Sequence, residues 1–125
     1  MTTDDILIFS YSRREALEDG VLIDVTETAK EAGFRVPVAM TSAAWATCVE
    51  IPRGVTGQDE AGRLWDVLTM LRYAGRGRAG EGSTVLFDVL VLNDAESPRP
   101  VRLKAVCGPD DDLSPCVTVM LPVED

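Results

Sequence analysis

The chain has 125 residues, 46% of them hydrophobic, and a formal net charge of −9. This length and apolar content are typical of one folded domain over residues 1–125 and exclude a disordered chain. The sequence lacks a run of about 18 apolar residues and its first residues are acidic, so we expect neither a membrane span nor a secretory signal, and therefore a cytoplasmic protein.

The negative charge is concentrated at the two ends of the chain. Residues 1–33 and 83–125 each carry −5, whereas residues 34–82 carry +1. Acidic ends disfavour direct contact with nucleic acid or anionic lipid and favour a basic partner. The same charge is equally compatible with a role that is only solubilising.

Helix caps organise the first part of the chain. Ser12 followed three residues later by Glu15 has the spacing of a capping box, which predicts a helix at 13–19 ended by Gly20. The β-branched run VLIDV at 21–25 is then a strand or an extended connector.

Two further helices follow in this half. Thr26 is expected to cap a helix at 26–32. Thr41 or Ser42 then caps a helix at 42–50, after Pro37 has excluded a continuing helix nearby.

The strongest helix pattern lies at 58–74, where Leu64, Leu68 and Leu71 fall on one stripe and Trp65 lies beside it. The glycine-rich segment 76–83 is expected to be a surface loop. This helix should pack across a sheet.

The last part of the chain is dense in β-branched and aromatic residues. Strands are predicted at 84–93, 100–107 and 116–122, separated by turns that contain Pro and Asp. We therefore expect an α+β fold, in which N-terminal helices pack on a small C-terminal antiparallel meander of about three to four strands. The expected core comprises Leu64, Trp65, Leu68, Leu71, Val85, Phe87, Val89, Leu103 and Val119.

The residues 9–45, FSYSRREALEDGVLIDVTETAKEAGFRVPVAMTSAAW, contain most of this helix punctuation. With GRLWDVLTMLR at 62–72 and VRLKAVCGPDDD at 101–112, this stretch resembles a family of small, acidic, uncharacterised proteins from bacterial plasmids, phages and integrative conjugative elements. The resemblance covers nearly the whole chain. It implies a mobile-element origin and a domain of unknown function, without implying an activity.

The sequence offers little catalytic chemistry. It contains no histidine, which is the commonest general base and the commonest metal ligand. Three scattered cysteines lack the spacing of a zinc or redox site, so we expect reduced core thiols, no cofactor and no metal. A small enzyme that uses only carboxylates remains an alternative, with Glu18, Asp19 or Asp66 as its acid–base groups.

Asp110, Asp111 and Asp112 lie in a predicted turn between two strands. Their spacing lacks the alternation and the distal glutamate of an EF-hand, so a solvated turn is favoured over a cation site. The same three carboxylates are alternatively a negative surface that docks against arginine or lysine of a partner.

We expect a partner-binding edge that combines this turn with the start of the first helix. Ser12 is best explained as a cap, whereas the neighbouring Tyr11 is as readily a contact residue. The candidate partner-binding residues are Tyr11, Arg13, Glu15, Glu18, Asp19, Asp110, Asp111 and Asp112.

These patterns favour an interaction protein over an enzyme. One hypothesis is a stoichiometric inhibitor of host defence, an anti-CRISPR or antirestriction protein that binds a basic nucleic-acid-handling site on a host protein. The alternative is an accessory or regulatory binding module of conjugation. The sequence does not fix the oligomeric state.

Overall fold

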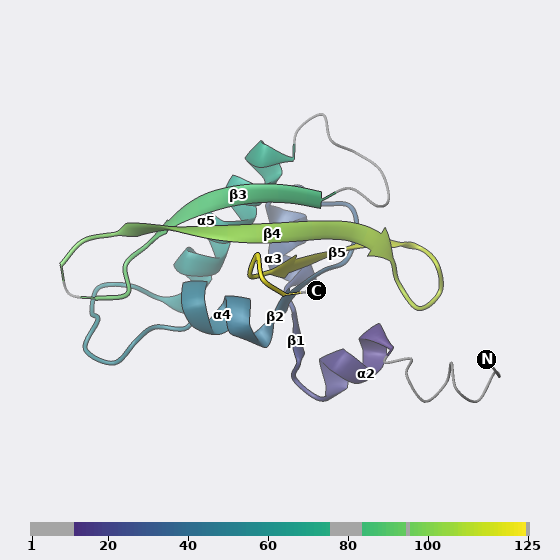
Figure 1. Ribbon diagram of the computed structural model, residues 1–125, viewed down its shortest axis with the longest axis horizontal. Helices are drawn as coiled ribbons and strands as arrows, with labels where there is room; N and C mark the ends of the chain where they lie inside the picture. Colours follow the sequence, from purple (N-terminus) through teal and green to yellow (C-terminus); the bar gives the residue numbers. More distant parts are fainter. Residues whose placement is uncertain (1–11, 76–83, 95, 125) are drawn as a thin grey trace.

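The computed structural model describes residues 12–75, 84–94 and 96–124 (Figure 1). The elements, in chain order, are α2 (Arg13–Glu18), β1 (Leu22–Asp24), α3 (Thr26–Glu31), β2 (Val38–Thr41), α4 (Ser42–Cys48), α5 (Glu60–Ala74), β3 (Thr84–Val91), β4 (Arg99–Pro109) and β5 (Pro115–Met120). All four predicted helices and all three predicted strands are confirmed, with ends within two residues of the prediction. The predicted loop at 76–83 lies outside the described residues.

The predicted cap of α2 by Ser12 is confirmed, although Glu15 accepts from the Ser12 hydroxyl and not from its backbone N–H as in a full capping box. The backbone N–H of Glu15 donates to Ser12 Oγ at 3.0 Å, and the Ser12 hydroxyl donates to Glu15 Oε1 at 3.0 Å. Gly20 follows the helix with φ +77°, as the predicted left-handed cap requires. Thr41 caps α4 by accepting from the N–H of Ala44 at 3.1 Å.

The predicted cap of α3 is wrong. Thr26 is the first helical residue, and Val25 occupies the cap position without a side-chain bond. The carboxylate of Asp24 takes the capping role instead, because its Oδ1 accepts from the Thr26 N–H at 3.0 Å. The Thr26 hydroxyl is then free to accept from the N–H of Val38 at 3.1 Å, which ties α3 to β2.

Five strands form one sheet in the order β1-β2-β5-β4-β3, so the α+β class is confirmed. Neighbouring strands run antiparallel except β2 and β5, which are parallel. The expected C-terminal meander is therefore only part of the sheet. The first half of the chain supplies β1 and β2: the buried residues Val38, Ala39 and Met40 of β2 lie beside β5, and β1 forms the edge next to β2.

One cluster of buried apolar side chains joins α3, α4 and α5 to one face of the sheet. Figure 1 shows α3 and α5 behind β3 and β4, with α2 apart from them beside β1. The alternating strand β3 contributes Val85, Phe87, Val89 and Val91 to this face. Among the described residues, no helix is long and apolar enough to cross a membrane.

The predicted core is confirmed for every residue except Trp65. Trp65 is 42% exposed, whereas Leu64, Leu68 and Leu71 are buried. At about 100° per residue, Trp65 lies roughly a quarter-turn around the helix from the centre of the stripe formed by these leucines. The buried face extends instead to Val67, which is 0% exposed on the other border of the stripe, so the indole lies on the outer flank of α5.

Arg63, on α5, is a charged side chain with only 6% exposure. Its Nε donates to the Cys48 carbonyl at 3.0 Å and its Nη1 to the Leu92 carbonyl at 2.8 Å. Nη2 donates to Asn93 Oδ1 at 2.6 Å, and Asn93 Nδ2 donates to the Thr47 carbonyl at 2.8 Å. The guanidinium therefore joins the end of α4, the first turns of α5 and the chain after β3. Its positive charge lies at the C-terminus of α4, where the helix dipole favours a cation.

The three cysteines are free thiols, as expected, with Cys48 and Cys116 buried and Cys107 half-buried. Burial raises the pKa of Cys48 to about 11, against the smaller opposing effect of Arg63. Burial also raises the pKa of Cys116. Both buried thiols are therefore protonated at neutral pH and are poor nucleophiles.

Gly33, which follows α3, is expected to be more sensitive to alanine than Gly20. Both glycines have positive φ, +103° and +77°. A Cβ at Gly33 would lie 1.6 Å from Arg72 Nη1, whereas a Cβ at Gly20 would meet nothing within 4 Å. Gly20→Ala should lower the free energy of unfolding by about 1 kcal/mol, which is the cost of the backbone conformation alone.

Gly33→Ala should cost at least about 1 kcal/mol more than Gly20→Ala, because it also displaces the Arg72 guanidinium from the Ala32 carbonyl, its acceptor at 2.6 Å. Urea unfolding of the two variants measures the difference. Equal losses would show that Arg72 moves aside without cost.

Candidate functional site

The turn between β4 and β5 is joined to the start of α2 by the carboxylate of Asp111. Its Oδ1 accepts from the N–H of Arg13 at 2.9 Å, and its Oδ2 accepts from the N–H of Arg14 at 3.0 Å. These amides are among the first N–H groups of α2, which have no partner within the helix. Two segments almost a chain length apart therefore form one continuous surface.

The turn itself is tightly hydrogen-bonded. The N–H of Asp110 donates to the Ser114 carbonyl at 2.7 Å, and the N–H of Leu113 donates to the Asp110 carbonyl at 2.9 Å. Asp112 Oδ1 accepts from the Ser114 N–H at 3.0 Å. Leu113 adopts φ +70°, a conformation that is strained for a branched side chain, and it is 77% exposed at the tip.

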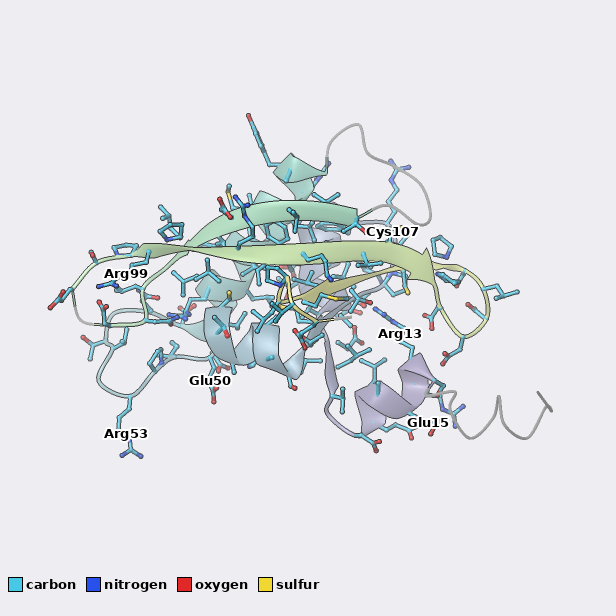
Figure 2. The ribbon with its side chains drawn as sticks, in the orientation of Figure 1. Arg13, Glu15, Glu50, Arg53, Arg99 and Cys107 are labelled. Atoms are coloured by element: carbon cyan, nitrogen blue, oxygen red, sulfur yellow. The ribbon has the colours of Figure 1, made fainter. Side chains whose placement is uncertain are left out.

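Arg13 points inward instead of towards solvent. Figure 2 shows its side chain extending from α2 towards β5. Nη1 donates to Thr118 Oγ1 at 2.5 Å and Nη2 donates to the Val117 carbonyl at 2.8 Å. Thr118 alternates with the core residues Val117 and Val119, so α2 lies on the sheet face opposite the core. The guanidinium therefore fixes α2 to the sheet.

The remaining acidic candidates point outwards. Glu15, Glu18, Asp19 and Asp112 are exposed, and Asp110 is half-exposed. Glu18 accepts from Arg14 Nε at 3.3 Å, in an ion pair whose two side chains are largely solvated. Figure 2 shows Glu15 on the side of α2 that faces away from the sheet.

We call this set the carboxylate surface: Glu15, Glu18, Asp19, Asp110, Asp111 and Asp112. Beside it lies a hollow of about 470 Å³, bounded by α2, the turn and β5. Tyr11, which was predicted to belong to the same edge, lies outside the described residues. The structure joins the turn to the first residues of α2 through Asp111.

Hydrogen bonds to the ionised form lower the pKa of two of these carboxyls. The pKa of Asp111 falls below its usual value chiefly because the backbone N–H of Arg14, and then that of Arg13, donates to it. The pKa of Asp112 is lowered chiefly by the Ser114 hydroxyl and then by the Ser114 N–H. Both groups therefore stay ionised well into the acidic range.

The folded-state pKa of Asp111 predicts how stability depends on pH. Because this pKa is depressed, the stabilising effect is complete above the unfolded value of about 3.9 and is lost as the pH falls through the folded value. Asp111→Asn should therefore destabilise the fold at neutral pH, and its difference from the wild type should shrink below about pH 4. Urea titrations across this range measure the effect.

Glu50→Gln is the control for this experiment, because Glu50 is exposed and Figure 2 places it away from α2. The control should follow the wild type at each pH. A constant difference between Asp111→Asn and the wild type at all pH values would contradict the capping role of the ionised carboxylate.

The residues considered for carboxylate catalysis are not assembled in one place. Asp66 lies on α5 and lines two grooves beside β3, whereas Glu18 and Asp19 line neither groove. Within the described ranges, no three Cys, Asp or Glu side chains are grouped so that they could hold a metal ion. The carboxylate surface is the arrangement with the clearest geometry for binding.

Two features that bear on function could not be read from the sequence pattern. The role of Asp111 as the cap of α2 depends on a contact across 98 positions, and no local signal carries it. The exposed Leu113 follows three aspartates in a turn where glycine or asparagine would be the usual left-handed residue. Both features result from the way in which β4 and β5 direct the turn towards α2.

The fold and this surface define a class: a small α+β protein with a mixed sheet and an acidic surface that joins two distant segments. The chain belongs to a family of unknown function, DUF6573, whose model matches residues 2–125. No curated protein and no solved structure matches the chain.

Proposed function

We propose that this chain is an interaction protein of a mobile genetic element that inhibits a host defence system by stoichiometric binding. Its target is a basic, nucleic-acid-handling site on a host protein, such as a CRISPR or restriction component. The observation that supports the proposal is the joining of α2 to the β4–β5 turn by Asp111, since this contact places the turn aspartates at the start of the helix that carries Glu15 and Glu18.

The physical reason is electrostatic complementarity. Clustered carboxylates accelerate association with an arginine- or lysine-rich groove and make that association sensitive to salt. The exposed leucine at the tip, Leu113, adds an apolar contact next to the charges. Because Asp111 fixes α2 and the turn relative to each other, their carboxylates are presented with little loss of conformational entropy on binding.

The test must leave the fold intact, and this requirement limits which acids are changed. Reversing all three turn aspartates would also remove the cap of α2, so lost binding could follow from lost structure. The better variant is Glu18→Lys combined with Asp110→Lys, which leaves Asp111 in place. The matched control is Glu27→Lys combined with Glu50→Lys, two exposed acids outside the carboxylate surface that give the same change of net charge.

Tagged wild-type protein is used to recover partners from a host that carries the element, and the recovered partner is titrated with each variant at low and high salt. We expect the Glu18 and Asp110 pair to weaken binding markedly at low salt, and the control pair to weaken it much less. Equal effects of the two pairs would show that Glu18 and Asp110 contribute to solubility and not to a specific contact with the partner. Recovery of a substrate-like small molecule or of conjugation proteins alone would replace the proposal with one of its alternatives.

A further inference from the structure

A second surface lies at the opposite edge of the sheet from β1, where β3 meets the outer flank of α5. A groove of about 300 Å³ opens there, lined on the α5 side by Trp65, Asp66 and Met70 and on the β3 side by Asp88 and Leu90. We call it the β3 groove. It takes no part in the carboxylate surface and is independent of the proposed function.

The β3 groove exposes large apolar side chains to solvent. Trp65 and Met70 are each 42% exposed and Leu90 is 65% exposed. Exposed apolar residues are ordinary when scattered, but here three of them line one concavity. Tryptophan beside an apolar hollow is also the side chain most enriched among residues that dominate binding energy.

The strand that borders the groove has an open edge. β3 spans Thr84–Val91 and, within the part of the chain that the structure describes, pairs only with β4. The other edge strand, β1, has only three residues. Along the open side of an edge strand, the N–H and C=O groups of every second residue have no strand partner. β3 contains neither lysine nor proline, which would block pairing with another strand. An extended chain could therefore pair with β3 while its side chains enter the groove.

The charges in the groove select the partner. Asp88 already accepts from Arg102 Nε at 2.9 Å, whereas Asp66 forms no salt bridge with a described residue. The uncompensated Asp66 favours lysine or arginine next to an apolar side chain. A second copy of this chain is disfavoured, because each copy carries −9 and a two-fold contact would bring its acids towards their counterparts.

We propose that the β3 groove binds an extended segment of another protein, which pairs with the edge of β3 and, on the face turned towards α5, places an apolar side chain against Trp65 and a lysine or arginine against Asp66. Backbone pairing supplies the orientation. The groove supplies the side-chain preference, because an acidic residue at the same position would meet Asp66.

The probe is a synthetic octapeptide that repeats valine-serine-lysine-serine, so that valine and lysine lie on the same face of the added strand, and its counterpart has glutamate in place of each lysine. Backbone amide shifts in NMR report where each peptide binds. We expect the lysine peptide to perturb the amides of β3 and of the Trp65 flank of α5, in a manner that weakens with salt, and the glutamate peptide to leave them unchanged.

Two variants and one control complete the experiment. Trp65→Ala should weaken the lysine peptide by about tenfold or more, and Asp66→Asn should weaken it less and flatten its salt dependence. Both side chains are exposed on the outer flank of α5, so we expect both variants to fold. Thermal unfolding of each variant checks this. Glu50→Gln, a carboxylate change outside the groove, should leave the affinity unchanged.

Three results would overturn the inference. The lysine peptide could perturb only the amides of the carboxylate surface, which would show that it binds through negative charge and not through the β3 groove. Its affinity could be the same for wild type and Trp65→Ala. Sedimentation could instead show a dimer that Trp65→Ala dissociates, which would assign the β3 edge to a second copy of the chain.

Discussion

Leu68→Ala is expected to lower the free energy of unfolding by about 2–5 kcal/mol. Leu68 is 0% exposed at the centre of α5, within the cluster that joins this helix to the sheet. Truncation removes apolar contacts within the cluster that also contains Phe87 and Val119, and leaves a cavity that a closely packed interior fills only in part. Denaturant unfolding followed by far-ultraviolet circular dichroism measures the loss.

The control is Met70→Ala on the same helix, since Met70 is 42% exposed. Both substitutions have similar effects on helix propensity, so their difference reports burial. Met70→Ala should cost less than about 1 kcal/mol. Similar costs for the two variants would mean that α5 does not pack on the sheet through the face that carries Leu68.

Arg63→Ala is expected to lower the free energy of unfolding by about 2–4 kcal/mol. The substitution leaves the carbonyls of Cys48 and Leu92 without their donor, and each unsatisfied buried acceptor carries its desolvation cost. Arg63→Lys should recover only part of the loss, because one ammonium cannot reproduce the forked contacts of a guanidinium. Denaturant unfolding of the two variants gives the comparison.

Arg53→Ala is the matched control, because Arg53 is exposed and Figure 2 shows it directed away from the body of the protein. Its effect should stay within about 0.5 kcal/mol. The double variant of Arg63→Ala with Asn93→Ala should cost less than the sum of the two single changes, since both belong to one hydrogen-bond network. Strict additivity would indicate that Arg63 acts on its neighbours independently of Asn93.

The parts of the fold that depend on local signals were predictable. Ser12, Thr41 and Gly20 fix helix ends through bonds or backbone conformations within a few residues, and the alternation in β3 is visible in the sequence itself. The strand β2 was not predicted, because three apolar residues between Pro37 and the helix cap Thr41 carry no period. Its parallel pairing with β5 depends on residues far along the chain.

The candidate site was predictable in composition but not in geometry. The acids of α2 and of the turn were expected to form one edge, and the structure joins the turn to the first residues of α2 through Asp111. The inward turn of Arg13 and the capping by Asp111 depend on long-range contacts that no spacing encodes. Trp65 was misassigned because a helical stripe does not reveal which of its borders the sheet covers.

The position of β5 determines when the sheet can close. It lies between β2 and β4, yet it is the last of the five strands in the chain. During synthesis the residues of β1, β2, β3 and β4 therefore all leave the ribosome before those of the central strand. Val38 and Leu103 can be buried in one cluster with Val119 only after β5 has been synthesised. Such non-local pairing slows folding, so the nascent chain exposes two unpaired inner strand edges, which are natural sites for chaperone binding, until β5 leaves the ribosome.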